Sequence, residues 1–229
     1  MQKSKTKMTA LCMVMLFFSY DFKEVGSDSG TGGGTGVAGG GRSDAMEVIK
    51  IGTQSWSAKN LEVSTYRNGD SIPQVQDAAA WAALRTGAWC YYENKEENGT
   101  TYGKLYNWYA VSDPRGLAPE GFHIPSDAEW TVLTDYLGGV LEAGAKMKSA
   151  SGWYEDGNGS NSSGFAGLPG GSRDGFGAFG VIGLYGGWWS STEVSTGNAR
   201  DRILYYANGF VFRGSDGKLS GLSVRCLGD

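Results

Sequence analysis

Residues 121–139 read GFHIPSDAEWTVLTDYLGG and carry the clearest secondary-structure signal in the chain. Ser126 and Glu129 have the spacing of a capping box, in which each side chain accepts a hydrogen bond from the other residue's backbone amide at a helix start. Gly138 favours a helix end. Between these signals, apolar residues recur at helical spacing: Trp130, Leu133 and Leu137. The stretch therefore predicts one amphipathic helix that begins at Ser126 and ends at Gly138.

The chain on either side of this helix predicts a few further elements. Branched apolar residues, a glycine and a tryptophan within residues 46–61 predict an opening hairpin. Alanines, Trp81 and Leu84 predict another helix near residues 76–84, and a short helical piece is expected around residues 141–148. The expected order is thus a hairpin followed by two main helices.

Beyond Ser149 the sequence changes to glycine, serine, asparagine and aromatic residues without a helical period. This texture predicts short strands joined by glycine turns. We place them at residues 164–168, 188–192, 202–206, 210–213 and 222–227. The predicted fold class is α+β, with two helices and a loop-rich, mostly antiparallel sheet.

The N-terminal residues predict export rather than a packed core. Three lysines precede an uncharged apolar run over residues 8–18, which is the pattern of an export signal and is too short to span a bilayer. A buried helix end is the alternative, but an acidic, glycine-rich stretch follows where a core helix would continue. We therefore divide the chain into an export signal and flank (1–25), a Gly/Ser-rich tether (26–45) and one domain (46–229).

Charge and composition argue against several classes of function. Lys and Arg number 20 against 24 Asp and Glu, with no basic block, so we expect no nucleic-acid partner. His123 is the only histidine, and we assign it a packing role. We predict no catalytic residue, cofactor or metal site. Calcium ligation by Asp156, Asn158 and Asn161 is an alternative to their reading as a solvated turn.

Separated motifs in the right order carry a family resemblance. They are WCYYENKEENGTTYGKLYNWYAV (89–111), GFHIPSDAEWTVLTDYLGG (121–139), GFAGLPGGSR (164–173), GGWWSSTE (186–193) and LSVRCLGD (222–229). From about Val48 to Asp229 the chain resembles the Fibrobacter succinogenes major paralogous domain, which is common in surface and secreted proteins of gut and rumen bacteria. The resemblance implies a C-type-lectin-like domain and an exported bacterial protein at the cell surface or outside it. Contact with the membrane is then expected only through the N-terminal signal or an anchor.

The same resemblance bears on the cysteines. C-type-lectin-like domains often close a long loop with a disulfide, which implies a bond between Cys90 and Cys226, worth roughly 4–5 kcal/mol in the chain-entropy model. Two buried free thiols are the alternative. Formylglycine-generating enzymes have a related fold but need a pair of nearby reactive cysteines, and this sequence has none. The sugar-binding calcium loop of true C-type lectins is also missing.

Residues 198–223, NARDRILYYANGFVFRGSDGKLSGLS, are the predicted binding segment. Family-pattern framework residues are Arg202, Leu204, Tyr206, Val211, Arg213, Lys218, Gly221 and Leu222. Strand alternation turns the residues between them to the opposite side. We predict that eight of these form one exposed ligand-binding patch: Asp201, Ile203, Tyr205, Phe210, Phe212, Ser215, Asp216 and Leu219. Trp188 and Trp189 are assigned to the core framework rather than to a sugar platform.

This layout resembles variable proteins diversified by retroelements, in which adenine-containing codons of a C-terminal sheet are rewritten. All eight patch residues are reachable from an asparagine codon by changing its adenines. The expected function is adhesin-like binding of an unknown surface protein or glycan, without enzymatic activity. A structural surface or fibre subunit is one alternative, and a formylglycine-generating-like oxidase is a second, disfavoured one.

Overall fold

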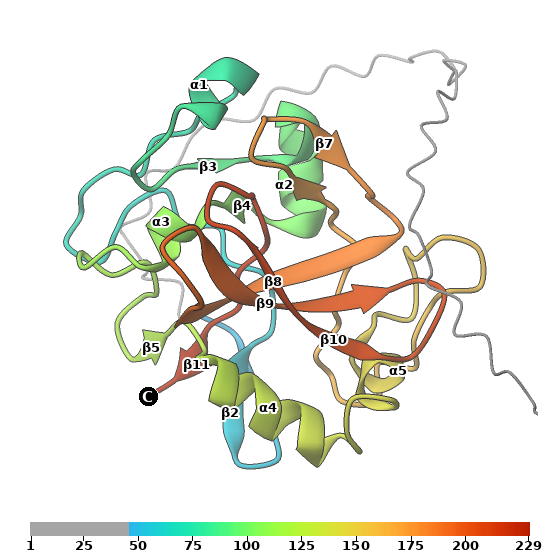
Figure 1. Ribbon diagram of the computed structural model, residues 1–229. Coiled ribbons are helices and arrows are strands. Elements are labelled where there is room, and N and C mark those ends of the chain that lie inside the picture. The colour runs from blue at the N-terminus through green and yellow to red at the C-terminus, as the bar shows by residue number, and fades with distance from the viewer. Residues whose placement is uncertain (1–45) are drawn as a thin grey trace, which may run out of the picture. The chain divides into compact units, whose positions relative to one another are not determined.

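The computed structural model describes residues 46–229 (Figure 1). The predicted export signal (1–25) and tether (26–45) lie outside the described residues. Within residues 46–229, none of the helices has the length and apolar character needed to cross a membrane.

The first part of the domain contains several short helices. They are α1 (Ala78–Ala82), the 3-10 turn η1 (Tyr92–Asn94), α2 (Glu96–Tyr102), α3 (Trp108–Val111), α4 (Asp127–Tyr136) and α5 (Ala143–Met147). The helices predicted near 76–84, from Ser126 and around 141–148 are confirmed as α1, α4 and α5. The prediction missed α2 and α3. α2 has the sequence EENGTTY, whose central Asn and Gly are poor helix formers, and α3 is a single turn without a period.

The start of α4 has the predicted capping box. The Ser126 hydroxyl accepts from the amide of Glu129 at 3.3 Å, and the Glu129 carboxylate accepts from the amide of Ser126 at 2.7 Å. Trp130 and Leu133 are fully buried on the inner side of the helix. The Trp130 ring lies 4.6 Å from that of Trp56, so the helix packs directly on the opening hairpin.

A four-stranded sheet joins the two ends of the domain. Its order is β1 (Val48–Ile51), β2 (Gln54–Ser57), β11 (Leu227–Gly228) and β5 (Phe122–His123). The β1–β2 pair confirms the predicted hairpin, with Ile51 opposite Gln54. Gly52 in the turn has φ +60°, a left-handed conformation that glycine adopts readily. The last strand therefore lies between the opening hairpin and the strand that leads into α4.

The C-terminal sheet has three antiparallel strands, β8 (Tyr185–Glu193), β9 (Asn198–Tyr205) and β10 (Val211–Gly217), in the order β10-β9-β8. Two small pairs complete the strands: β3 (Trp89–Cys90) with β4 (Leu105–Tyr106), and β6 (Ser172–Arg173) with β7 (Phe179–Gly180). Figure 1 shows α4 lying along one side of the C-terminal sheet. The described residues thus form a mixed fold with short helices and several antiparallel sheets, as the predicted α+β class requires.

Two of the predicted strands are not formed as expected. Residues 164–168 make only one isolated bridge, between Gly167 and Lys148. They form a loop from which the fully buried Phe165 side chain packs into the core. Residues 222–226 make isolated bridges to Tyr106 and Trp188 instead of a continuous strand. The apolar residues that suggested strands in these two segments are mostly buried, but they lie in loops and do not pair continuously with a neighbouring strand.

The core consists of three clusters of buried side chains. One lies between α4 and the C-terminal sheet and contains Trp56, Trp130, Phe165, Trp188 and Leu204. A second contains Tyr106, Trp108, Trp189, Leu222 and Cys226, and a third contains Trp81, Cys90, Tyr92 and Leu105. Trp188 and Trp189 are both fully buried, which confirms their assignment to the framework.

The predicted disulfide is not confirmed. Cys90 and Cys226 are free thiols, both fully buried, and they pack in different clusters of the core. Each cysteine packs among the buried hydrophobic side chains of its cluster, and the Cys90 thiol also lies beside the Arg173 guanidinium. Burial raises the pKa of Cys90 to about 11 and that of Cys226 to about 12. Both thiols are therefore protonated at neutral pH.

Candidate functional site

The two faces of the C-terminal sheet differ in what covers them. Two rows of paired residues cross the three strands on the same face. One row consists of Trp188, Arg202 and Arg213, and the other of Gly186, Leu204 and Val211. These residues make up the helix face, which is packed against α4. Because successive strand residues point to opposite sides, the other residues form a second, outer face. The outer face carries Tyr185, Asp201, Ile203, Tyr205, Phe212 and Asp216.

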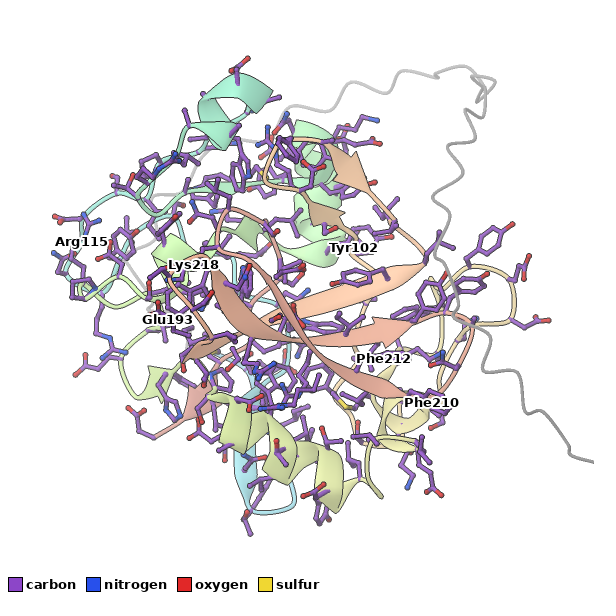
Figure 2. The ribbon with its side chains drawn as sticks, viewed as in Figure 1. Tyr102, Arg115, Glu193, Phe210, Phe212 and Lys218 are labelled. Atoms are coloured by element: carbon purple, nitrogen blue, oxygen red, sulfur yellow. The ribbon has the colours of Figure 1, made fainter. Side chains whose placement is uncertain are left out.

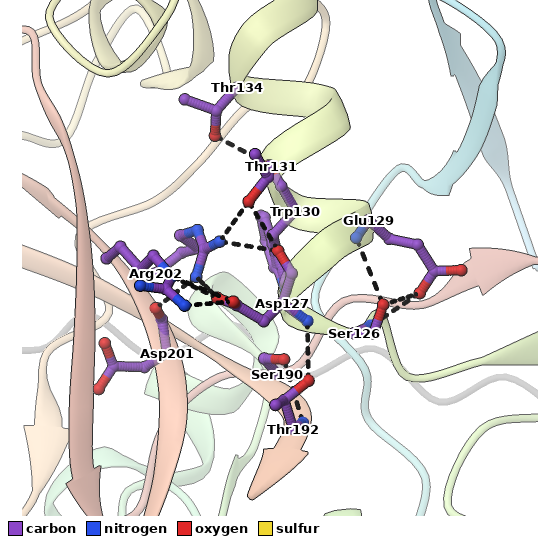
Figure 3. Close-up of polar contacts among 11 residues, drawn as sticks. Ser126, Asp127, Glu129, Trp130, Thr131, Thr134, Ser190, Thr192, Asp201 and Arg202 are labelled. Carbon is purple, nitrogen blue, oxygen red and sulfur yellow. Dashed lines mark hydrogen bonds and ion pairs between the residues drawn. The ribbon is translucent and has the colours of Figure 1, made fainter. Parts of the chain in front are cut away.

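The helix face is bonded to the first residue of α4, as Figure 3 shows. Arg202 donates from Nη1 to Oδ1 of Asp127 at 2.7 Å, and Arg213 donates from Nη2 to Oδ2 at 2.7 Å. The Arg213 hydrogen bond is the main reason why the pKa of Asp127 falls to about 2, and Arg202 adds to it. The framework roles predicted for Arg202 and Arg213 are confirmed, and α4 holds both β9 and β10.

Part of the outer face is an exposed apolar surface. Ile203 lies directly opposite Phe212, and both Ile203 and Tyr205 are half-buried. Phe210 and Phe212 are 39% and 42% exposed, with ring centroids 6.0 Å apart. Figure 2 shows these two rings at the same end of β10. We call this surface the aromatic patch: Ile203, Tyr205, Phe210 and Phe212.

The expectation of one exposed patch of eight residues is wrong in three places. Asp201 is fully buried, because it lies opposite Trp189 at the end of the sheet against which α3 packs. Ser215 is exposed but lies opposite Arg200, outside the row of the aromatic patch. Leu219 lies beyond the end of β10. Whether any of the eight residues binds a ligand stays a prediction.

Leu219 lines a separate, shallow pocket of about 490 Å³. Other lining residues include Arg85, Tyr109 and Lys218, together with Phe176, which is 85% exposed. Nothing in the sequence around Phe176 distinguished it from the other glycine-rich loops, so this pocket was missed.

A buried lysine holds the connection between β9 and β10. Lys148 Nζ donates to the carbonyls of Asn208 at 2.9 Å and Tyr206 at 3.2 Å, and also to the carbonyl of Gly157. Burial lowers the pKa of Lys148. The sequence offered no signal for this role, because a lysine next to a helix end is usually solvated. One ammonium group thus fixes the loop that leads to Phe210.

His123 connects α4 to the last residue of the chain. Its Nε2 lies 2.9 Å from Oε1 of Glu129, and its Nδ1 lies 2.8 Å from Oδ1 of Asp229. Burial acts to lower the pKa of His123, but the hydrogen bonds and charges of the two carboxylates outweigh it and leave that pKa raised. Its surroundings favour the charged ring, in which both nitrogens donate. His123 therefore has a structural role between two elements.

The segment that contains the alternative calcium ligands, residues 156–161, uses asparagine side-chain oxygens to stabilise turns. Asn158 Oδ1 accepts from the amide of Trp153 at 3.0 Å, and Asn161 Oδ1 accepts from the amide of Ala166 at 2.8 Å. Asp156 is exposed. Across residues 46–229, no three His, Cys, Asp or Glu side chains are grouped so that they could hold a metal ion.

Comparison with known proteins identifies one family. A family model described as the Fibrobacter succinogenes major domain matches residues 49–227. Searches of curated proteins and of solved structures found no match. The matched region runs from β1 to β11, so it includes every strand of the C-terminal sheet.

Proposed function

The protein belongs to the Fibrobacter succinogenes major domain family, and we propose that it is an exported, adhesin-like protein that binds a ligand without catalysis. In this proposal the domain has a C-type-lectin-like fold, and residues 1–25 direct it to the cell surface or beyond. The ligand is a surface protein or a glycan, and it contacts the outer face of the C-terminal sheet. The residues between the framework positions are those that a retroelement would diversify.

The aromatic patch is the observation that carries this proposal. Monomeric proteins seldom keep several large apolar side chains together in solvent unless they bind something. Phenylalanine and tyrosine rings offer a large contact area for a small loss of side-chain entropy, and aromatic residues are enriched among binding hot spots. Phe210 and Phe212 have this exposure, and Ile203 and Tyr205 lie beside them.

The rigidity of the scaffold supports the same function. Asp127 fixes β9 and β10 from the helix face, and Lys148 fixes the loop between these strands. A surface that is already ordered loses less entropy when it binds. The patch therefore has both exposed apolar area and a fixed shape.

A structural surface or fibre subunit is the second candidate. The observation that favours it is the position of β10 at the edge of its three-stranded sheet. Edge strands with unpaired backbone groups can pair with a strand of another chain. Light scattering at high protein concentration distinguishes the two functions, because a fibre subunit self-associates and a monomeric adhesin does not. An oxidase has less support, since Cys90 and Cys226 are buried in separate clusters.

A binding array tests the proposed function. The full chain is applied to an array of glycans and bacterial and host surface proteins, together with the Phe212→Ala variant and a matched control, Phe176→Ala. Phe176 is also an exposed phenylalanine but lies outside the aromatic patch. We expect Phe212→Ala to weaken binding by about 2 kcal/mol or more and Phe176→Ala to leave it unchanged. Equal effects of both variants, or no bound ligand at all, would overturn the proposal.

A further inference from the structure

Asp201 is a buried acid without a side-chain partner. It is fully buried, and among residues 46–229 no side chain donates a hydrogen bond to its carboxylate. The backbone amide of Gly214 lies close enough to lower its pKa, but that effect is smaller than the effect of burial. Other buried charged groups of the domain do have partners: Arg202 binds Asp127, and Lys218 binds Glu193 at 2.7 Å. A buried unpaired carboxyl costs free energy, so a protein that keeps one has a use for it or lacks its partner.

The Asp201 carboxylate lies on the outer face, over a glycine. Asp201 is opposite Gly214 in the register of β9 and β10. A Cβ on Gly214 would collide with Oδ1 of Asp201 and would lie 3.1 Å from Cδ1 of Ile203. Glycine at position 214 therefore leaves the space that this carboxylate occupies. Figure 3 shows the Asp201 side chain turned away from the ion pair between Arg202 and Asp127.

Two further titratable groups, one of them a carboxylate, lie near Asp201 on the same face. Asp216 follows Gly214 by two residues on β10 and is half-buried. Tyr185 is on β8, and its ring crosses Gly187, since a Cβ there would lie 2.8 Å from the tyrosine hydroxyl oxygen. We call these three side chains the acidic recess: Asp201, Asp216 and Tyr185.

The electrostatics of the acidic recess point to a missing cation. Burial first, and then the charge of Asp216, raise the pKa of Asp201 to about 7. Burial alone raises the pKa of Asp216. The pKa of Tyr185 is raised by burial and then by the charges of Asp216 and Asp201. The charge of Asp216 thus disfavours ionisation of Asp201 and Tyr185, and a positive charge placed beside these groups would oppose that effect.

The acidic recess adjoins the aromatic patch. Ile203 separates Asp201 from Tyr205 along β9, and Phe212 is two residues from Gly214 on β10. Carboxylates bind ammonium and guanidinium groups through charge-assisted hydrogen bonds, and aromatic rings attract the same groups. The long apolar stems of lysine and arginine also pack well on such rings.

We propose that the acidic recess receives the ammonium or guanidinium group of a lysine or arginine side chain on a protein partner. The aromatic patch contacts the stem of that side chain and the apolar residues beside it. Asp216, which is part-exposed, makes the contact, and the buried Asp201 acts through it as a positioning residue. The inference rests on the proposed function and deepens it by naming the chemistry of the partner.

A titration with small cations tests the recess without knowledge of the partner. Labelled full-length protein is titrated with n-butylammonium or n-butylguanidinium chloride, and with n-butanol as the neutral control, while NMR follows the Ile203 methyl and Gly214 amide signals. We expect both cations to shift these signals at concentrations about tenfold below that of butanol, a difference of about 1.4 kcal/mol. Equal responses to cations and butanol would overturn the proposal.

Two variants and a control show which carboxylates cause the preference for cations over butanol. Asp216→Asn should remove the preference for cations, whereas Asp135→Asn, at an exposed acid on α4, should leave it unchanged. Asp201→Asn should weaken the preference several-fold and remove its dependence on pH between 6 and 8. The charged or titratable groups that act on Asp201 are Asp216 on β10, Tyr185 on β8, and Arg200 and Arg202 on β9. A cation preference that persists unchanged in folded Asp216→Asn protein would contradict the inference, and this variant carries the test if Asp201→Asn does not fold.

Failure of this inference can be separated from failure of the proposed function. If Phe212→Ala abolishes binding on the array while Asp216→Asn leaves it intact, the aromatic patch binds a ligand and the recess does not take part. If both variants bind the array as the parent does, both proposals are wrong. Loss of binding in both variants, together with a cation preference in the titration, supports both.

Discussion

Arg202 in the middle strand of the C-terminal sheet donates a 2.7 Å hydrogen bond to Asp127, the first residue of α4. The two side chains are only 3% and 16% exposed, so solvent screens their interaction weakly. Arg202 also donates to the backbone carbonyl of Asp127 at 2.9 Å. The orientation of β9 relative to α4, and with it the position of the outer face, depends on this contact.

Replacing Asp127 should destabilise the domain strongly. Asp127→Ala leaves the buried Arg202 guanidinium without its anionic partner, which we expect to cost about 3–5 kcal/mol of the free energy of unfolding. Arg213→Ala is the matched control and should cost under about 1 kcal/mol, because Arg213 is 52% exposed. Chemical denaturation measures both values. A similar small effect of the two variants would show that Arg202 is adequately solvated.

Substitutions in the core and in the aromatic patch should have different effects. A core substitution should lower stability, and a patch substitution should weaken ligand binding. Leu204→Ala removes a fully buried side chain and should cost roughly 2–5 kcal/mol of stability through the cavity left behind. Phe212→Ala and Tyr205→Ala should cost under about 1 kcal/mol of stability but about 2 kcal/mol or more of ligand binding. Melting temperatures and binding constants are measured side by side. If the aromatic variants melt as early as Leu204→Ala, these rings belong to the core.

Removing the Lys148 ammonium should loosen the β9–β10 connection. Lys148→Met leaves several backbone carbonyls without a donor, including those of Tyr206 and Asn208, and should cost about 1–3 kcal/mol of stability. Hydrogen exchange over residues 205–210 should accelerate more than elsewhere. Lys50→Met, at an exposed lysine in β1, is the control and should change neither quantity. Unchanged exchange in Lys148→Met protein would mean that the loop is held by other contacts.

The His123 bridge should stabilise the domain at low pH. The folded-state pKa of His123 is raised, so its contribution is fully present below the unfolded pKa of about 6.5 and is lost as pH rises through the folded value. His123→Gln should therefore lower stability at pH 5.5 and have little effect at pH 8.5. Urea denaturation of both proteins at the two pH values measures the difference. A constant difference across this range would contradict a charged bridge.

Ionisation of Asp201 should destabilise the folded domain, whereas ionisation of a carboxylate in an ion pair stabilises it. Its folded pKa of about 7 lies above the ordinary aspartate value of 3.8, so ionisation of Asp201 increasingly destabilises the folded domain as pH rises through that interval. Asp201→Asn should thus raise stability at pH 8 by up to about 4 kcal/mol, with little change at pH 4. A variant that is more stable and yet poorer at binding cations fits a group retained for binding. Lower stability of Asp201→Asn at pH 8 would show that the carboxylate has a partner in the folded state.

Local chemistry in the sequence determined several elements of this protein. The capping box predicts the start of α4 because its two hydrogen bonds involve only residues three apart, and the hairpin of β1 and β2 follows from its local turn. Strand alternation also separated Leu204 from Ile203 and Tyr205, because the period of a strand does not depend on its neighbours.

Only the tertiary structure decided which outer-face residues are exposed. Asp201 and Phe212 share the outer face, yet Asp201 is fully buried beside Trp189 of β8, the strand that α3 contacts, while Phe212 is 42% exposed. The separation of Cys90 and Cys226 into different clusters, and the carbonyls that surround Lys148, likewise join segments far apart in the chain. Local patterns determine the direction of a side chain. What covers that side chain depends on distant segments, whose packing no single stretch of sequence encodes.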